Sequence, residues 1–430
     1  MSPMRIVSPA RLSVVLMCVL LTFGGLVLLG APATAQSESS VFTIGAMRYL
    51  SNYPEGMTWE IEATSSAGPI TRATLFYDFG GPTTGRVQAN ILNAADGVIR
   101  ASLLRHEAGG LIPWLDVHYT WRLVDAAGNA IEIEGPPAIY EDPTREWQHA
   151  ENDLVRVYWF GLPDWVGEEA LDAVDAARDR WALGFPGVTL ESRPLVVIYP
   201  DLDSFLEWRG EAGSESIRFV GTLREEWNGT VQRVPDQARL DRECGGLNLT
   251  RDFDHVVRAL ARSTVVHELT HFHQYAMNSA IGPTWWVEGQ ATFFEDPVRP
   301  YDPTERVLRL AAMGELPSLA YGDTLPGAGT LGPDGCTHVA YDVGAVFLDF
   351  LRDNYGGYEA HGEITRLVSE NVGIYAAIET VTGKSFAELE AEWRDSLGAG
   401  PAPTPVPTPT PFIFELPTPS YGSTGSGSGS

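Results

Sequence analysis

The motif H-E-x-x-H at residues 267–271 brings together the residue types in this chain that are best suited to chemistry. Upstream, apolar residues between 254 and 266 recur at steps of three and four, which predicts an amphipathic helix that continues through the motif. On a helix, His267 and His271 share one face and can direct two imidazole nitrogens at one ion ~2.0–2.1 Å away. Glu268 then lies beside that ion, where its carboxylate can take a proton from an attacking water and return it to a leaving amine. The motif therefore predicts metal-dependent hydrolysis, and the alternative is a pair of surface histidines on a helix.

A second segment offers a third metal ligand. After a Gly-Pro break at 282–283, the sequence predicts another helix, capped by Thr284. This helix contains Glu288, and a His-His-Glu set with an open fourth position is one of the known arrangements of a catalytic zinc. Gly289 and Ala291 are small, so we expect this helix to lie close to the motif helix. The alternative is that Glu288 is a solvated helix residue.

The two segments resemble the gluzincin branch of zinc metallopeptidases and, within it, the bacterial proteins described as peptidase MA-like. The resemblance depends on HELTHFHQY at 267–275 and PTWWVEGQATFFED at 283–296, which is similar to that group's W-x-x-E-G-x-A segment. It implies that His267, His271 and Glu288 bind one catalytic Zn²⁺ and that Glu268 is the catalytic acid and base. The match extends more weakly through residues 338–344 and 347–356, and through residues 382–386 and 389–394, which are similar to the family's C-terminal helices. In all, the resemblance covers about half of the chain.

The chain departs from the related aminopeptidases at one point. Their G-x-M-E-N segment, whose Glu grips the amino terminus of a substrate, has no counterpart between Arg218 and Asp252. The resemblance therefore implies an endopeptidase rather than an aminopeptidase. Residues 218–223 predict a strand, and residues 229–234 predict the edge strand that would pair with an extended substrate. A hairpin with no role in substrate binding has the same pattern.

Tyr341 is the predicted donor to the oxyanion of the tetrahedral intermediate. Such a donor acts strongly where charge develops in a site that excludes water. In the resembling family a tyrosine downstream of the third ligand often has this role, and Tyr341 begins a predicted helix with apolar spacing as far as Phe350. A core tyrosine with a satisfied hydroxyl is the alternative. His273 lies about 200° round the helix from His271, so we expect it to pack or support the site rather than bind metal.

The first 35 residues predict export. They hold Arg5 and Arg11, an apolar run at 12–30, and the small residues Ala-Thr-Ala at 33–35, a pattern typical of a signal peptide and its cleavage site. An uncleaved anchor is the alternative, because the apolar run is nearly long enough to span a bilayer. In either case the catalytic part would face outward, and we predict a secreted, extracellular protein.

The charge of the chain argues against nucleic acid as a partner. Loss of the export segment removes two arginines and no acidic residue, so the formal charge goes from −27 to −29. A surface this acidic repels phosphate and anionic lipid, so we expect a peptide or protein substrate and no stable membrane insertion. Lys384 is the only lysine in the sequence.

Two cysteines remain once the export segment and its Cys18 are set aside. In an exported protein Cys244 and Cys336 most simply form one disulfide, which would tie the region before the motif helix to the region before Tyr341. A cysteine zinc ligand is the competing interpretation, although neither residue has a C-x-x-C partner.

The order of the elements predicts two folded parts and a tail. Residues 36–145 alternate apolar and polar positions in short runs, which predicts an all-β sandwich of immunoglobulin or fibronectin type III character. Residues 146–398 predict an α+β, zincin-like metallopeptidase domain, with strands at 154–160 and 195–199 and helices at 168–183 and 202–208. Residues 399–430 predict a Pro/Thr-rich linker and a Gly/Ser tail, which is compatible with association at a cell surface.

These features together predict a secreted zinc peptidase in which Glu268 activates water. Two alternatives stay open. One is an exported binding or scaffold protein that retains a zincin fold without catalysis, and the other is a zinc hydrolase of non-peptide amides.

Overall fold

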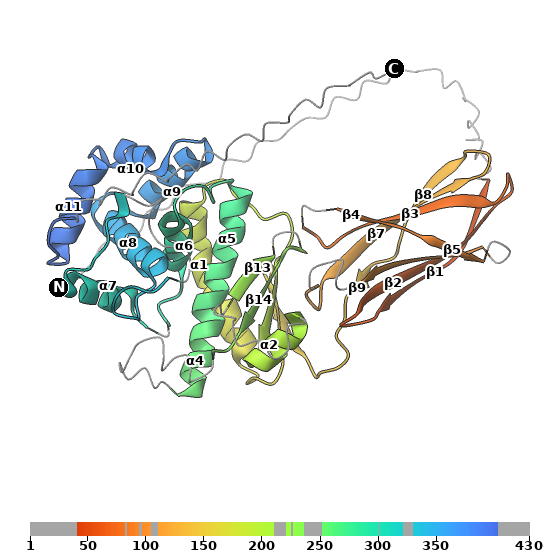
Figure 1. Cartoon of the computed structure of the whole chain (residues 1–430), viewed down its shortest axis with the longest axis horizontal. Coiled ribbons are helices and arrows are strands. Elements are labelled where there is room, and N and C mark those ends of the chain that lie inside the picture. The colour runs from red at the N-terminus through yellow and green to blue at the C-terminus, as the bar shows by residue number, and fades with distance from the viewer. Residues whose placement is uncertain are drawn as a thin grey trace, which may run out of the picture. The chain divides into compact units, whose positions relative to one another are not determined.

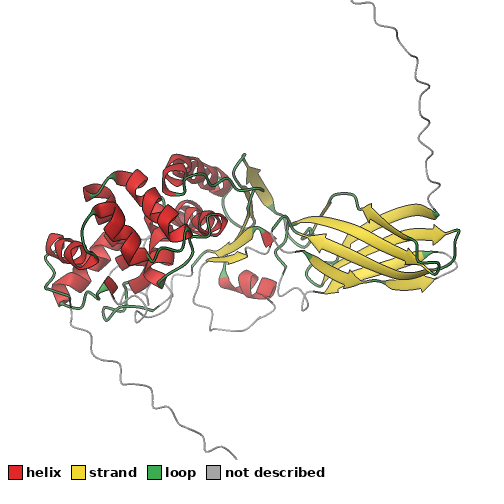
Figure 2. Cartoon of the chain, turned by 90° about the horizontal axis from the view of Figure 1, so that it is seen from above, coloured by secondary structure: helices red, strands yellow, loops and turns green. Residues whose placement is uncertain are grey.

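The computed structural model describes residues 41–81, 84–93, 97–104, 111–209, 221–224, 227–235, 252–299, 301–320 and 330–402. The predicted export segment, Cys18, Cys244 and the tail from residue 403 lie outside these ranges. Strands predominate in the N-terminal part of the described chain and helices in the C-terminal part (Figure 2). In the described ranges, no helix combines the length and the apolar character needed to cross a membrane.

The N-terminal part consists of strands β1 (Phe42–Ser51), β2 (Gly56–Ser65), β3 (Ile70–Asp78), β4 (Gly85–Gln88), β5 (Asn90–Asn93), β6 (Val98–Leu104), β7 (Asp116–Asp125), β8 (Ala130–Glu134) and β9 (Ala138–Ile139). They form one antiparallel sheet of order β1-β2-β6-β5 and another of order β4-β3-β7-β8, with β9 paired to β7 (Figure 1). Alternate residues of β2 and β7 are buried, as the period of a strand with one covered face requires.

Aromatic rings from both sheets meet at the fully buried Trp59 of β2. Its ring lies 5.9 Å from that of Tyr77 on β3 and 6.1 Å from that of Tyr119 on β7, measured between centroids. The predicted order, a β region followed by a region rich in helices, is confirmed. The immunoglobulin or fibronectin type III character of the β region stays a prediction, as does the boundary at residues 145 and 146, which falls after β9.

A third sheet follows, made of β10 (Gln148–Glu151), β11 (Arg156–Trp159), β12 (Leu195–Tyr199), β13 (Gly221–Arg224) and β14 (Gly229–Arg233), with helices α1 (Val166–Gly184) and α2 (Leu202–Arg209) between its strands. Its order is β10-β11-β12-β14-β13, in which β11, β12 and β14 run parallel. The prediction that residues 229–234 form the edge strand is therefore wrong. The parallel β12 and the antiparallel β13 occupy the two sides of β14, so β13 is at the edge.

The remaining described chain is helical and holds the predicted ligands. Its elements are α4 (Phe253–Ala259), the π-helical turn η2 (Leu260–Thr264), α5 (Val265–Ala276), α6 (Thr284–Phe294), α7 (Pro303–Met313), the π-helical turn η4 (Val339–Val343), α8 (Gly344–Asn354), α9 (Gly357–Ser369), α10 (Ile374–Thr382) and α11 (Phe386–Ser396). Large apolar side chains such as Trp285, Trp286, Phe347 and Trp393 are buried between them. These side chains supply much of the apolar contact that fixes α6 and α8 in place.

Candidate metal centre

The helix that carries the H-E-x-x-H motif begins at Asp252, whose side chain accepts a 2.7 Å hydrogen bond from the backbone N–H of His255. It continues from α4 through η2 into α5, where His267 and His271 are one turn apart. A π-helical turn holds one residue more than an α-helical turn, and such turns are frequent at functional sites. Here the turn ends at Thr264, three residues before His267.

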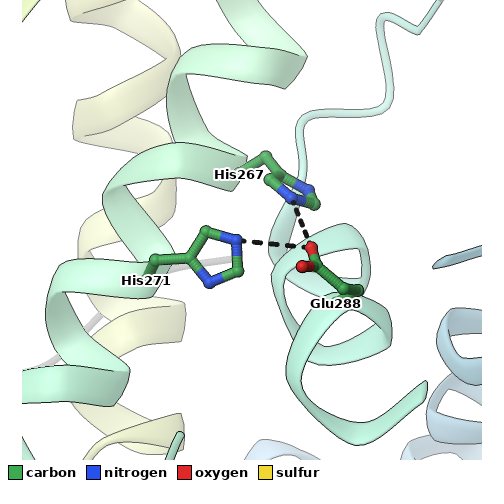
Figure 3. A group of neighbouring side chains, drawn as sticks. All are labelled: His267, His271 and Glu288. Atoms are coloured by element: carbon green, nitrogen blue, oxygen red, sulfur yellow. Dashed lines mark ion pairs between the residues drawn. The ribbon is translucent and has the colours of Figure 1, made fainter. Parts of the chain in front are cut away.

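The third ligand candidate, Glu288, projects from α6 toward both imidazoles (Figure 3). Its Oε2 lies 3.4 Å from Nε2 of His267 and 3.5 Å from Nε2 of His271. Two atoms bound tetrahedrally to one zinc, each ~2.0–2.1 Å from it, lie about 3.4 Å apart, so the spacing fits a shared ion. Among the described residues, these three side chains are the one group of His, Cys, Asp and Glu whose ligand atoms come close enough to hold a metal.

The other ring nitrogen of each histidine is also engaged. Nδ1 of His267 lies 2.9 Å from Oε1 of Glu295, and Nδ1 of His271 lies 2.7 Å from Oε1 of Gln274. A carboxylate or amide oxygen can only accept, so Nδ1 donates in both cases and Nε2 keeps its lone pair for a metal. Two nitrogens and one carboxylate oxygen form a donor set that suits zinc.

Sequence reasoning missed Glu295 and Gln274 as partners of the histidines, although spacing contained a signal for both. Gln274 is three residues after His271 on the same helix, which makes the two side chains neighbours. Glu295 is seven residues after Glu288, about two helical turns, so both carboxylates point to one side of α6. A search for acceptors at these spacings would have found them.

The charges at the site favour a bound cation. Burial would lower the pKa of His267, but its contacts with Glu288 and Glu295 raise that pKa to about 10. Burial would raise the pKa of Glu288, but hydrogen bonds from both imidazoles hold it well below its ordinary value. The carboxylates thus require a positive charge between them, which either protons or a metal ion can provide.

Glu268 is buried beside this group and belongs to the same helix. Burial raises its pKa, the imidazoles of His267 and His271 oppose the rise, and the carboxylates of Glu288 and Glu295 add to it. A carboxyl group with a raised pKa exchanges protons more readily near neutral pH than an ordinary glutamate does.

Tyr341, which belongs to η4, lies beside the same group of side chains. Its ring is nearly parallel to that of His267, with 5.6 Å between centroids and 20° between planes. Burial, the charges of Glu288 and Glu268, and a hydrogen bond to Glu288 raise the pKa of Tyr341, so its hydroxyl stays protonated and can donate. The structure therefore places the predicted oxyanion donor beside the three ligand candidates.

Close contact between α6 and α8 brings Tyr341 near Glu288. A Cβ on Gly289 would lie 2.7 Å from Cα of Gly344, and a Cβ on Gly344 would lie 2.2 Å from the carbonyl oxygen of Trp285. Both distances are shorter than packed atoms tolerate, so only glycine allows this approach. As predicted, α6 lies close to the motif helix, since Nε2 of Gln274 donates to the carbonyl oxygen of Val287 at 2.8 Å. Gly289, however, faces α8 rather than the motif helix.

The prediction for Thr284 is wrong, whereas the prediction for His273 is confirmed. The predicted cap of α6 by Thr284 is wrong, because Thr284 is the first helical residue and Pro283 is the N-cap, without a side-chain hydrogen bond. His273 packs as predicted. Its ring stacks on Trp181 with 4.6 Å between centroids, and its Nδ1 lies 3.0 Å from the carbonyl oxygen of Leu269.

Cys336 is disulfide-bonded. The partner predicted for it, Cys244, lies outside the described residues. The bond excludes Cys336 as a metal ligand, since a disulfide sulfur has no thiolate to offer.

No model of a known protein family matches the sequence, and no curated protein matches it either. Among solved structures, the chain is similar to aminopeptidase A of Legionella pneumophila in complex with aspartic acid, with 12% identity over 83% of this chain and 50% of that chain and a TM-score of 0.32. It is also similar to native leukotriene A4 hydrolase from Saccharomyces cerevisiae, with 12% identity over 87% and 72% of the two chains and a TM-score of 0.28. A third is a polysaccharide deacetylase from Bacillus cereus, with 8% identity over 41% and 57% and a TM-score of 0.17. The chain spans about half the length of the aminopeptidase and of the deacetylase. At such low identities and TM-scores, the functional assignment depends on the chain's own residues.

Proposed function

We propose that this protein is an exported zinc-dependent peptidase of the gluzincin kind. The observation that supports this most strongly is the convergence of Nε2 of His267, Nε2 of His271 and Oε2 of Glu288, with oxygen–nitrogen distances of 3.4 and 3.5 Å. Glu268 and Tyr341 lie beside them without being needed as ligands. Three ligands leave one coordination position for water or substrate, which is the pattern of a catalytic zinc rather than a structural one.

The residues around the ligands have complementary tasks in this proposal. When bound, a zinc ion would acidify a coordinated water and polarise a carbonyl group. The carboxylate of Glu268 takes the proton of the attacking water and delivers it to the nitrogen of the leaving amine, which is the sequence a peptide bond requires. The hydroxyl of Tyr341 donates to the oxygen of the substrate carbonyl as negative charge develops there.

The finer proposal is that the enzyme is an endopeptidase that acts outside the cell. The absence of a G-x-M-E-N segment in the sequence removes the glutamate that would bind a free amino terminus, and thereby supports internal cleavage. The apolar segment and small-residue site near the amino terminus support export. The acidic composition supports peptide rather than nucleic acid as the substrate.

The decisive experiment combines metal analysis of the purified protein with cleavage of a peptide library derived from a proteome. We expect about one zinc per chain and cleavage within peptides whose amino termini are blocked by acetylation, and we expect a chelator to abolish that cleavage. Cleavage confined to peptides with free amino termini would contradict the endopeptidase. Stoichiometric zinc without cleavage of any peptide would contradict the peptidase and favour a binding protein.

Replacement of Glu268 tests the mechanism itself. Glu268→Gln keeps the size of the side chain and removes the base, so we expect at least a hundredfold loss of kcat with zinc content unchanged. Glu359→Gln, an exposed glutamate of α9, is the matched control and should retain full activity. A Glu268→Gln variant as fast as the unmodified enzyme would end the proposal.

A further inference from the structure

We propose that Gln274 is a positioning residue of the metal centre, and that Gln290 and His361 hold it in the orientation that makes His271 a ligand. The inference depends on the metal binding in the proposed function, but not on peptide hydrolysis. It rests on a chain of hydrogen bonds that begins on α5, crosses α6 and ends on α9.

The orientation of Gln274 is fixed by a backbone carbonyl. Its Nε2 lies 2.8 Å from the carbonyl oxygen of Val287 and 2.8 Å from Oε1 of Gln290. A carbonyl oxygen accepts and never donates, so the amide nitrogen of Gln274 has to face Val287. Its Oε1 then has to face His271, whose Nδ1 is 2.7 Å away.

This orientation selects the tautomer of His271. Because Oε1 of Gln274 only accepts, Nδ1 of His271 carries a proton, and a neutral imidazole then keeps its lone pair on Nε2, the atom available to the proposed zinc. The opposite tautomer would place a proton on the atom that has to bind zinc.

The end of this hydrogen-bond chain on α9 is fixed in the same way. Nε2 of Gln290 lies 2.9 Å from Nε2 of His361 and 3.1 Å from Oγ1 of Thr365. The hydroxyl of Thr365 donates to the carbonyl oxygen of His361 at 3.0 Å, so it accepts from Gln290. His361 accepts as well, and the amide of Gln290 cannot turn over without losing both partners.

Burial makes these orientations obligatory. Gln274, Gln290 and Thr365 are fully buried, and His361 is 4% exposed. Water cannot replace a lost partner there, and an unsatisfied buried polar group costs about 1–3 kcal/mol. The interior of the helical part thus holds Gln274 rigidly from the side opposite the metal.

The test is the zinc affinity of the full chain, measured by competition with a chelator of known affinity. Gln274→Met has similar length and offers no amide oxygen, so we expect affinity to fall about 10–100-fold, the range found when a ligand's hydrogen-bond partner is removed. Gln290→Met should cause a smaller loss, of about threefold to tenfold. In the double variant Gln290→Met should add nothing, because it acts through Gln274.

Gln232→Met separates positioning from general destabilisation. Gln232 is also fully buried, and its Nε2 donates to the carbonyl oxygen of Thr264 at the end of η2, immediately before α5, but its side chain has no hydrogen bond to His267 or His271. We expect zinc affinity to stay within about twofold in this control. An equal loss in Gln232→Met and Gln274→Met would overturn the inference.

A direct view of the tautomer completes the experiment. In the zinc-loaded protein with ¹⁵N-labelled histidine, we expect Nδ1 of His271 to carry a proton that is hydrogen-bonded to Gln274, and we expect Gln274→Met to remove that hydrogen bond and shift the Nδ1 signal. Unchanged signals together with unchanged zinc affinity would overturn the role of Gln274. If the unmodified chain bound no zinc, the metal centre itself would be wrong, and that failure is visible before any variant is made.

Discussion

The interiors of the β region, strands β1 to β9, and of the helical part, α4 to α11, differ in kind. Within the described residues of the β region, Asp125 is the one buried residue with a charged or non-aromatic polar side chain, and it closes the turn between β7 and β8. The helical part buries many such residues, namely Ser263, His267, Glu268, Thr270, Gln274, Ser279, Gln290, Thr292, Asp296, Arg306, Ser318, Thr337, Asp342, His361, Thr365, Glu390 and Arg394.

The two kinds of interior have different roles: an apolar interior stabilises a fold, whereas a polar interior can also position groups that carry out chemistry. Apolar burial stabilises a fold by removing carbon from water, and it needs no polar partner. A buried polar group adds stability only when its hydrogen bonds are complete. A polar interior therefore loses folding free energy at every buried group that lacks a partner. The helical part has such an interior, and one chain of its buried hydrogen bonds leads through Gln290 and Gln274 to His271. We therefore expect changes in the two interiors to have different consequences.

The largest effect is expected for Glu288→Gln. Loss of the charge that both imidazoles contact should lower zinc affinity by at least about 100-fold and abolish cleavage, since ligands contribute more than their hydrogen-bond partners do. Metal analysis after dialysis measures this. Glu305→Gln, on the exposed face of α7, is the control that should keep its zinc. Full zinc content in Glu288→Gln would show that Glu288 is not the third ligand.

Trp59→Ala tests the apolar interior of the β region. It removes a fully buried ring at the meeting of the two β sheets, and we expect the free energy of unfolding of the β region to fall by about 3–5 kcal/mol. Urea denaturation measures the loss. Zinc affinity should not change, and a tenfold drop in it would show that the two regions are not independent.

Tyr341→Phe removes a hydroxyl from the polar interior without changing its packing. We expect kcat to fall about 100-fold, as is typical when one oxyanion donor is lost, with KM and zinc content unchanged. Steady-state kinetics on a mapped peptide measure both constants. Tyr355→Phe, whose hydroxyl contacts Glu392 at the surface, should behave as the unmodified enzyme. Equal kinetics of the two variants would make Tyr341 a core residue.

The smallest effect concerns acid stability. Burial lowers the pKa of His361 from 6.5 to about 3. As pH falls below 6.5, the unfolded chain takes up this proton and the folded chain does not, so the folded state loses stability down to about pH 3. His361→Gln keeps an acceptor for Gln290 and cannot titrate.

Between pH 6.5 and 4, the free energy of unfolding should therefore fall less steeply in His361→Gln than in the unmodified protein. The two slopes should differ by up to about 1.4 kcal/mol per pH unit, which denaturation curves of both proteins measure. Gln232→Met, which removes a buried polar side chain that cannot titrate, is the control, and its curve should keep the slope of the unmodified protein. Parallel curves for His361→Gln would show that His361 is protonated in the folded state.

The sequence was sufficient for the parts of this structure that depend on local spacing. Helical periodicity placed His267 and His271 on one face, and the break at 282–283 placed Glu288 on the next helix. Strand β12 has the predicted bounds, because five consecutive apolar residues between two prolines leave little ambiguity.

The parts that depend on distant contacts were not predictable. The order of strands follows from long-range pairing, so β14 could not be recognised as internal from its own residues. Whether Gln290 contacts His361 depends on how α6 packs against α9, and a separation of 71 positions along the sequence does not reveal it. The π turns η2 and η4 also escape a pattern search, because each inserts a residue into an otherwise regular period.

The glycine pair between α6 and α8 makes the centre vulnerable to a change that involves no polar atom. A single methyl group at Gly344 would meet the backbone of Trp285 and force the two helices apart. Tyr341, three residues before, would move with its helix and lose its reach to Glu288. The proposed chemistry would thus be lost through steric bulk alone, with His267, His271 and Glu288 unchanged.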